Sequence, residues 1–194
     1  MLEILLDNKD GNVWNISEIV AGVTWKTARV GKPASLEFTM LKNGIYQATN
    51  FRVNNGDIVR FRDGDQDVFY GYIFSIDFGK DEDVKILAYD QVRYLLASDT
   101  YVFKNTSVSE VVQQIAEDFS LSTGTLADTG YRIPTMVEDG QTLLDIIEKA
   151  ITLTLWNTQR HYVFYDDFGA LTVRNVEDMR VDIRIGNGIL YDYA

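Results

Sequence analysis

The sequence has no cysteine and a single histidine, His161, among its 194 residues. The absence of cysteine excludes a disulfide framework, a thiolate zinc site and a cysteine nucleophile. A histidine-based metal site or a Ser-His-Asp triad would have to be built around His161 alone. That residue begins an apolar and aromatic segment, where a structural role is the better interpretation.

Proline, glycine and long apolar runs are also scarce. Two prolines and fourteen glycines are too few for collagen-like or low-complexity sequence. No apolar run approaches the roughly 20 residues that a membrane-spanning helix needs. The first residues, Met1–Asp7, have no basic flank and no long apolar stretch, so we expect no signal peptide.

Basic residues are fewer than acidic ones: the sequence has 18 Lys and Arg and 29 Asp and Glu, which give a formal net charge of −11. Nucleic-acid binding needs a basic surface that replaces condensed counterions, and anionic membranes attract basic segments. We therefore expect no specific nucleic-acid binding and no membrane insertion. The chain is 46% hydrophobic and 12% aromatic, which excludes a disordered tail and predicts one or two folded domains.

Residues 1–98 have the pattern of an all-β unit. Segments of strand length and composition alternate with polar turns such as Asn8–Asn12, Asp63–Asp67 and Gly79–Asp83. Several strands joined by short turns favour a closed barrel or a sandwich. The expected strands are Leu2–Asp7, Val13–Ile16, Val23–Val30, Ser35–Leu41, Ile58–Arg62, Val68–Phe78 and Val84–Tyr89.

Residues 99–185 predict a small α+β domain with two helices and a β-hairpin. A short strand is expected at Tyr101–Phe103. Ser107 and Glu110 then match a capping box. Apolar residues recur at helical spacing after this box, so we expect a helix over residues 108–119.

A similar unit follows in the sequence. Tyr131–Pro134 is expected to be extended, because the residue before proline avoids the α region. Thr142 and Asp145 repeat the capping pattern before a helix whose apolar positions run from Leu143 to Leu155. The two successive units indicate either an internal duplication or two strand-helix units that arose independently.

The last part of the sequence predicts more strands. His161–Tyr165 and Ala170–Arg174 flank the turn Asp166–Gly169 and form the expected hairpin. Alternating apolar residues in Val181–Ile185 predict another strand. Residues 186–194 stay apolar and aromatic to the last position, which indicates the truncated start of a further domain.

Clusters of aspartate are the candidate metal sites. Asp63, Asp65 and Asp67 alternate as in a calcium loop, but an EF-hand also needs a later glycine, a distal glutamate and flanking helices. All such clusters stand where a hairpin must turn, and Asp and Gly favour turns for backbone reasons. We interpret them as solvated turns and expect no metal site. The other clusters are Asp7 with Asp10, Asp81–Asp83, and Asp166 with Asp167.

No catalytic constellation stands out in the sequence. A glycosidase needs two carboxylates across a cleft, but among 29 acids some pair always looks plausible. The sequence has no G-x-S-x-G elbow and no phosphate-binding or dinucleotide-binding glycine motif. We expect no enzyme, no catalytic residue and no cofactor. The glutamates in amphipathic patterns fit solvated faces: Glu37, Glu110, Glu138 and Glu148.

Aromatic residues are the last candidates for a binding role. Trp14, Trp25 and Trp156, with eleven tyrosines and ten phenylalanines, could form a platform for a sugar. Because their neighbours are apolar, packing in a core or an interface is the better interpretation.

From residue 84 onward the sequence also resembles a known family. Ile86–Leu95 is similar to the segment that closes the first domain of the PBSX-like XkdQ/YqbQ tail proteins. The resemblance covers most of residues 84–185, in order, and the first 83 residues only loosely. Its further matches are Asp99–Phe103, Ile115–Phe119, Asp128–Pro134, Thr142–Ile147 and Tyr162–Leu171.

The resemblance implies a baseplate hub protein in the tail of a phage or phage-like particle, assembled in the cytoplasm of the bacterial host. Such hubs are related to the T-even type hub and the late-control gene D family. Their barrels resemble the tail tube protein, and a trimer with two barrels per chain lets a threefold spike meet a sixfold tube. The implied partners are further copies of the chain, the tube protein, and spike or tail-tip proteins.

The resemblance also sets a domain organisation. Family members are considerably longer, so this chain would hold the first tube-like barrel, residues 1–98, the small inserted domain, residues 99–185, and the start of a third, residues 186–194. It could then lack the capacity to trimerise. The resemblance supplies no catalytic residue.

Three functions stay open at this point. A structural hub predicts extended surfaces and strand edges that await partners. A cell-wall or carbohydrate-acting module predicts a polar cleft with convergent acids. A calcium-dependent adhesion module predicts stabilisation by calcium. The lack of catalytic motifs and the barrel-like first half favour the hub.

Overall fold

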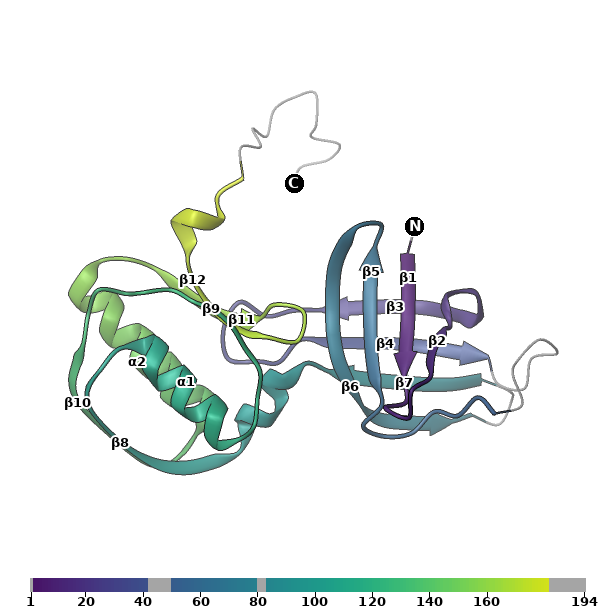
Figure 1. The fold of residues 1–194 in the computed structure, drawn as a ribbon, viewed down its shortest axis with the longest axis horizontal. Helices are drawn as coiled ribbons and strands as arrows, with labels where there is room; N and C mark the ends of the chain where they lie inside the picture. The colour runs from purple at the N-terminus through teal and green to yellow at the C-terminus, as the bar shows by residue number, and fades with distance from the viewer. Residues whose placement is uncertain (1, 42–49, 80–82, 182–194) are drawn as a thin grey trace, which may run out of the picture.

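The structure, a computed structural model, describes residues 2–41, 50–79 and 83–181. A large β-sheet occupies one side of the molecule, and two helices with two smaller sheets occupy the other (Figure 1). Mainly β structure followed by an α+β part is the fold class that the sequence predicts. No helix in the described part of the chain is long and apolar enough to cross a membrane.

The large sheet has seven strands in the order β2-β1-β5-β6-β7-β4-β3, and every neighbouring pair is antiparallel. The strands fall close to the segments that alternation predicts, because most of them bury alternate side chains and expose the others more fully. A short 3-10 helix, Ser17–Ile19, stands between the second and third strands. The strands are β1 (Leu2–Asp7), β2 (Val13–Asn15), β3 (Val20–Lys26), β4 (Ser35–Leu41), β5 (Ile58–Asp63), β6 (Gln66–Phe78) and β7 (Asp83–Tyr89).

The predicted closed barrel is not confirmed, because this sheet is open. Its edges are β2 and β3, which do not pair with each other. Closure needs hydrogen-bonded neighbours for both edge strands. The edge strand β2 has only three residues, and β3 changes register against β4 between Ala21 and Thr24. The sheet still curves strongly: β1 and β5 run across the direction of β3, β4 and β7 (Figure 1).

The long strand β6 carries much of this curvature. It pairs with both β5 and β7 and shifts register against β7 between Ile73 and Ser75, and such irregularities bend a strand. Gly71 occupies an inward position in β6, where an added Cβ would lie 2.4 Å from the Tyr89 carbonyl oxygen and 2.5 Å from the Phe69 ring. Glycine at this position therefore allows the strand to pack closely against its neighbours.

The inner face of the curved sheet forms the first hydrophobic core. Phe38 is the largest of its fully buried side chains. Partly buried residues such as Val68 and Ile76 pack against this core. The buried members are Ile4, Leu6, Ile16, Leu36, Phe38, Met40, Val59, Phe61, Phe69, Ile73, Val84, Ile86 and Ala88.

The second part begins after a 3-10 helix, η2 (Gln91–Leu96). Strands β8 and β10 form an antiparallel pair, and β11, β12 and β9 form a three-stranded sheet in which β9 runs parallel to β12. A final 3-10 helix, η3, spans Val176–Met179. The other elements are β8 (Ser98–Thr106), α1 (Val108–Asp118), β9 (Thr123–Leu126), β10 (Ile133–Thr142), α2 (Leu143–Thr158), β11 (Tyr162–Asp166) and β12 (Leu171–Asn175).

Both predicted helix starts are confirmed. The Ser107 hydroxyl accepts the Glu110 N–H, and the Glu110 carboxylate accepts the Ser107 N–H at 2.9 Å, which completes a capping box. The Thr142 hydroxyl accepts the Asp145 N–H at 3.1 Å. These side chains accept hydrogen bonds from backbone N–H groups of the first turn, which have no acceptor within the helix.

The second hydrophobic core lies around the two helices, which contact each other and strands of both small sheets. Its first buried residue along the chain is Val92, whereas the first core ends at Ala88. The two cores are therefore consecutive in the sequence. The buried members are Val92, Leu95, Tyr101, Phe103, Val108, Val111, Val112, Ile115, Ala116, Ile133, Met136, Leu143, Leu144, Ile146, Ile147, Ala150, Tyr162, Leu171 and Val173.

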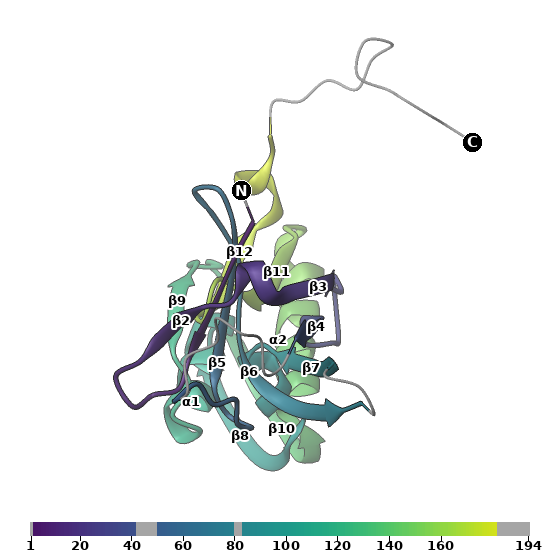
Figure 2. The same ribbon diagram turned by 90° about the vertical axis from the view of Figure 1, so that its right-hand side faces the viewer.

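The strand and the further domain predicted near the end of the chain can be compared with the structure only at Val181. Val181 is described and is not in a strand. The rest of the predicted strand Val181–Ile185, and the predicted further domain at residues 186–194, lie outside the described residues. From a second direction, η3 and the last described residues extend beyond the two helices (Figure 2).

Candidate functional site

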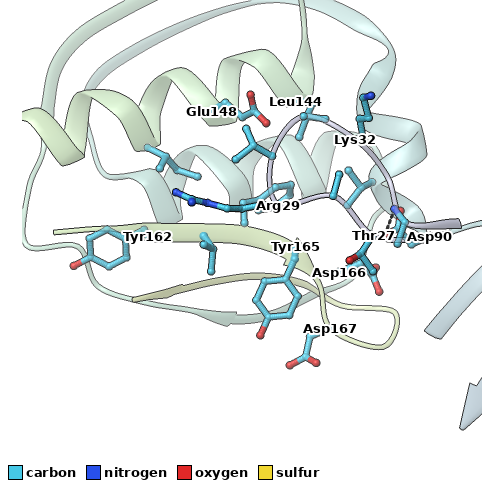
Figure 3. A pocket seen from close by; sticks show the side chains of 18 of the residues that line it. Thr27, Arg29, Lys32, Asp90, Leu144, Glu148, Tyr162, Tyr165, Asp166 and Asp167 are labelled. Carbon is cyan, nitrogen blue, oxygen red and sulfur yellow. Dashed lines mark hydrogen bonds between the residues drawn. The ribbon is translucent and has the colours of Figure 1, made fainter. Parts of the chain in front are cut away.

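A pocket of about 640 Å³ lies where the large sheet meets the helical part (Figure 3). Its walls come from the segment between β3 and β4, the start of β6, helix α2, and the hairpin of β11 and β12. Most of the wall is apolar. The polar and charged lining residues are Thr27, Arg29, Lys32, Asp67, Tyr70, Asp90, Glu148, Thr152, His161, Tyr162, Tyr165, Asp166 and Asp167.

The turn of the β11–β12 hairpin connects the two parts. The Phe168 ring meets the Tyr70 ring edge-on, with 5.6 Å between centroids, and the Arg62 guanidinium lies 5.3 Å from the centre of Phe168. Gly169 has φ +89°, and an added Cβ would lie 2.8 Å from the Tyr70 ring. The turn therefore fits against β6 because residue 169 has no side chain and can adopt a positive φ.

Asp90 closes the other side of the pocket. It follows β7 and is only 4% exposed. Its Oδ2 atom accepts the Ala34 N–H at 2.9 Å, and its own N–H donates to the Ala34 carbonyl at 3.2 Å. Its Oδ1 atom is buried without a hydrogen-bond partner. Burial, with a contribution from the charge of Asp166, raises the pKa of Asp90 to about 7.

Asp166 ends β11 and reaches the same junction. Its Oδ1 atom accepts the Gly169 N–H at 2.6 Å, whereas its Oδ2 atom is buried without a partner. Burial raises the pKa of Asp166, and contacts with Gln91 oppose this shift. Asp90 and Asp166 lie at the same end of the pocket (Figure 3), near enough for the charge of Asp166 to raise the pKa of Asp90.

The remaining charges of the pocket are more exposed. Arg29 and Lys32 stand on the segment before β4, and Glu148 stands on α2 (Figure 3). Burial raises the pKa of Glu148, and the backbone of Gly31 opposes the shift. The pocket thus combines an apolar wall, two exposed cations and a buried pair of carboxyl groups.

A second feature is an aromatic surface on the outer face of the sheet. Side chains at alternate positions of β6 point away from the core, and their rings meet edge-on or tilted at centroid distances of 5.5 to 6.0 Å. We call this surface the aromatic face. Its members are Tyr70, Tyr72, Phe74, Tyr89, Tyr94 and Phe168.

Among the described residues, four cations lie over the aromatic face. The guanidinium of Arg93 is 5.3 Å from the centre of Tyr89 and 5.8 Å from that of Phe74, and the Lys9 ammonium is 5.2 Å from the centre of Tyr72. Arg60 and Arg62 complete the set. Such contacts hold cations in place over rings, and tyrosine with arginine is the composition enriched in protein interfaces.

Within the described residues the acidic clusters lie in turns or at the strand ends beside them, whereas Asp81 and Glu82 of one predicted cluster lie outside the described residues. Asp67 pairs with Arg62 at 2.6 Å across the β5–β6 turn, and Asp7 pairs with Arg60 at 2.8 Å. Asp10 accepts the Asn12 N–H within its own turn. No three His, Cys, Asp or Glu side chains of the described residues are placed to hold a metal ion. Asp166 departs from the prediction of a solvated turn, since its carboxylate is mostly buried.

The remaining sequence candidates do not meet in one site. His161 is exposed at the rim of the pocket, and its carbonyl accepts the Val176 N–H at 2.9 Å. Trp14 packs edge-on against Phe51 and donates to Asn8 at 2.7 Å, while Trp156 is exposed. The aromatic face instead uses tyrosine and phenylalanine, which the alternation in Val68–Phe78 could have indicated.

A comparison of the sequence with protein families finds a YqbQ-like family model that matches residues 23–194. The chain belongs to this family. The XkdQ protein of the phage-like element PBSX in Bacillus subtilis is 35% identical over 161 residues, which cover 81% of this chain and 49% of that protein. YqbQ of the same organism is 31% identical over 164 residues, which cover 83% and 49%. The chain thus spans about half the length of these relatives.

Solved structures share the fold of this YqbQ-like chain. The 43 kDa tail protein of prophage MuSo2 from Shewanella oneidensis has a TM-score of 0.62 at 19% identity, covering 88% of this chain and 52% of that one. A tail protein from Neisseria meningitidis has a TM-score of 0.66 at 12% identity, covering 89% and 50%. The resemblance to the XkdQ/YqbQ family is therefore confirmed, and the chain shares its fold with tail proteins of prophage MuSo2 and Neisseria meningitidis.

Proposed function

We propose that this YqbQ-like chain is a structural, non-catalytic part of the baseplate hub of a phage or phage-like tail. In the full-length protein it would form a trimeric ring that adapts the sixfold tail tube to a threefold spike or tip. Family membership and the fold shared with prophage tail proteins support this role. Residues 1–98 and 99–185 would act as its first two domains, with Val92 and Leu95 before this boundary packed in the second core.

The observation that carries the proposal is the large open sheet. Within the described residues each of its edge strands, β2 and β3, pairs on one side only, and the other side offers backbone groups to which another chain could pair. Its outer face presents the aromatic face, where rings and cations stand together on a chain of net charge −11. Edges and aromatic surfaces of this kind suit a protein that assembles with others.

Solution mass tests the assembly. Light scattering would compare the 194-residue chain with a longer form in which the C-terminal half found in the relatives follows residue 194. A trimer for the longer form and a monomer for the shorter one is the expected result. If both forms stay monomeric at high concentration and in the presence of the tube and spike proteins, the proposed ring is wrong.

A charge reversal tests the aromatic face. Arg93 has its guanidinium over two rings of this face, so Arg93→Glu should weaken binding to the tail tube protein of the same particle at least about tenfold while leaving the melting temperature nearly unchanged. Lys104→Glu makes the same charge change on exposed β8, away from the face, and serves as the control. Equal binding by both variants would show that the tube does not use this face.

Catalysis by the chain would contradict the proposal. Incubation with purified peptidoglycan should release no soluble sugar or peptide. Release that Asp166→Asn abolishes would favour a cell-wall-acting module, because Asp166 is the most enclosed acid of the pocket wall on the helical side.

A further inference from the structure

The strongest unexplained feature is the pair of carboxyl groups between the two cores. Asp90 belongs to the chain that leaves the sheet core, and Asp166 belongs to a hairpin of the helical core. Each has one buried oxygen atom without a hydrogen-bond partner, Asp90 Oδ1 and Asp166 Oδ2. A buried oxygen that lacks a donor costs free energy, and two like charges in one enclosed site cost more.

A single proton would relieve both costs. A protonated carboxyl group donates a hydrogen bond, which a neighbouring carboxylate can accept. The pair would then hold one negative charge instead of two. We propose that Asp90 and Asp166 share one proton across the junction at neutral pH, and that loss of this proton loosens the contact between the large sheet and the helical part.

The hydrogen bonds of the pair explain why its charge matters for the junction. Asp90 accepts from Ala34, which anchors the pocket wall before β4, and Asp166 accepts from Gly169, which anchors the hairpin turn against Tyr70. Repulsion between two ionised groups would push these anchors apart. The proton therefore acts on the elements that form the pocket.

Among the residues that the structure describes, neither Asp90 nor Asp166 forms an ion pair with a cation. The Arg93 N–H donates to the main-chain carbonyl of Asp90 at 3.2 Å, and its guanidinium lies over Phe74 and Tyr89. Asp167 adds negative charge beside Asp166, and Tyr72 is near enough that Asp166 raises its pKa. The other charged groups that line the pocket are Arg29, Lys32, Asp67, Glu148 and His161.

The sign of the pH dependence follows from linkage. The pKa of Asp90 is about 7 in the folded protein and about 3.9 in an unfolded chain. Between these values the folded state binds more protons, so its stability is full below about pH 4 and falls as the pH rises through 7. Asn in place of Asp90 cannot ionise and should remove this dependence.

The first experiment uses the 194-residue chain and its Asp90→Asn variant. The unfolding equilibrium constant would be measured in urea between pH 4 and pH 8.5. The ratio of the wild-type constant to the variant constant should rise with pH, by up to about tenfold per pH unit. Asp65→Asn is the matched control: it removes one exposed charge from the β5–β6 turn, outside the pocket wall, and should leave the wild-type pH profile unchanged. A constant ratio between wild type and Asp90→Asn would overturn the proposal.

Two further measurements need no stable variant. The ¹³C shift of the Asp90 carboxyl group should titrate near pH 7, and a midpoint near 4 would contradict a shared proton. Amide exchange at Ala34 and Gly169 should speed up above that midpoint beyond the ordinary effect of base, measured against Glu110. A rise in melting temperature with calcium that Asp90→Asn abolishes would instead show that the pair holds a metal ion.

Discussion

The two halves of the molecule solve the same packing problem in different ways. The sheet half buries one face of a curved seven-stranded sheet and leaves its outer face and both edges available. The helical half encloses two helices between small sheets, and its helices begin with local side-chain caps. One half is therefore organised by contacts distant in sequence, and the other contains elements that neighbouring residues specify.

This difference separates stability from assembly. The sheet half exposes Trp25 on an edge strand and Tyr94 of the aromatic face, whose other rings are half-buried, so these are the surfaces that partners would cover. The helical half also exposes Val102 and Val137, which are partners in register on the outer side of β8 and β10. A pair of valines is a smaller apolar surface than the ladder of rings, which points to the sheet as the main assembly surface.

The largest expected losses of stability come from replacing one buried phenylalanine in each core by alanine, which leaves a cavity. Phe38 in the sheet core is 1% exposed and Phe103 in the helical core is 2% exposed. Phe38→Ala and Phe103→Ala should each lower the free energy of unfolding by about 3–5 kcal/mol. Urea unfolding followed by amide exchange would measure both losses.

The same pair of variants tests whether the halves are separate domains. If they are, Phe38→Ala should speed exchange mainly at Ile86 and its neighbours, and Phe103→Ala mainly at Ile115 and its neighbours. Equal acceleration in both halves by either variant would show that the two cores unfold as one unit, contrary to the proposed division.

A smaller effect is expected at the junction of the halves. Gly169→Ala should destabilise the protein by about 1–3 kcal/mol, because alanine meets both a positive φ and the Tyr70 ring. Gly140→Ala is the control, since Gly140 has φ +61° and no atom within 4 Å of an added Cβ. The difference between the two melting temperatures isolates the contact with β6. Equal shifts would mean that Tyr70 moves aside without cost.

The sequence predicts the elements that neighbouring residues specify better than the contacts between distant segments. Local patterns suffice for α1, since the Ser107–Glu110 box and the apolar spacing lie within a few residues of each other. The parallel strand β9 was not predicted, because Thr123–Leu126 has no alternation and pairs with β12 almost fifty residues later. The open sheet and the Asp90–Asp166 pair depend on register and burial, which distant segments determine. The sequence around Asp166 therefore predicts a solvated turn, and only the packing of distant segments buries its carboxyl group.

The helix caps offer a matched test of the local contribution. Ser107→Ala and Thr142→Ala should each cost about 1 kcal/mol, because each leaves a backbone donor of the first turn unsatisfied. Thr152→Ala, at an exposed position within α2, should be neutral or slightly stabilising, since alanine has the higher helix propensity. Thermal unfolding would rank the three variants, and a loss at Thr152 equal to that at Thr142 would argue against capping.

The smallest expected effects come from surface ion pairs, and two such pairs, one in each half, differ in geometry. Arg132 makes two contacts with Glu110, at 3.0 and 2.8 Å, whereas Lys26 and Glu37 make one contact at 3.7 Å between exposed strands. Arg132→Ala should cost at most about 1 kcal/mol and Lys26→Ala close to nothing, because water and salt screen exposed pairs.

The pH dependence of the Arg132 pair has a definite sign. The Ser107 N–H, followed by Arg132, lowers the pKa of Glu110, so the stability that this carboxylate contributes is present near neutral pH and is lost as the pH falls through that lowered value. Arg132→Ala should therefore flatten the acid side of the unfolding profile slightly, while Lys26→Ala leaves it unchanged. Identical acid profiles for both variants would place the lowered pKa with the capping box alone, and the geometric difference between the two ion pairs would then have no energetic consequence.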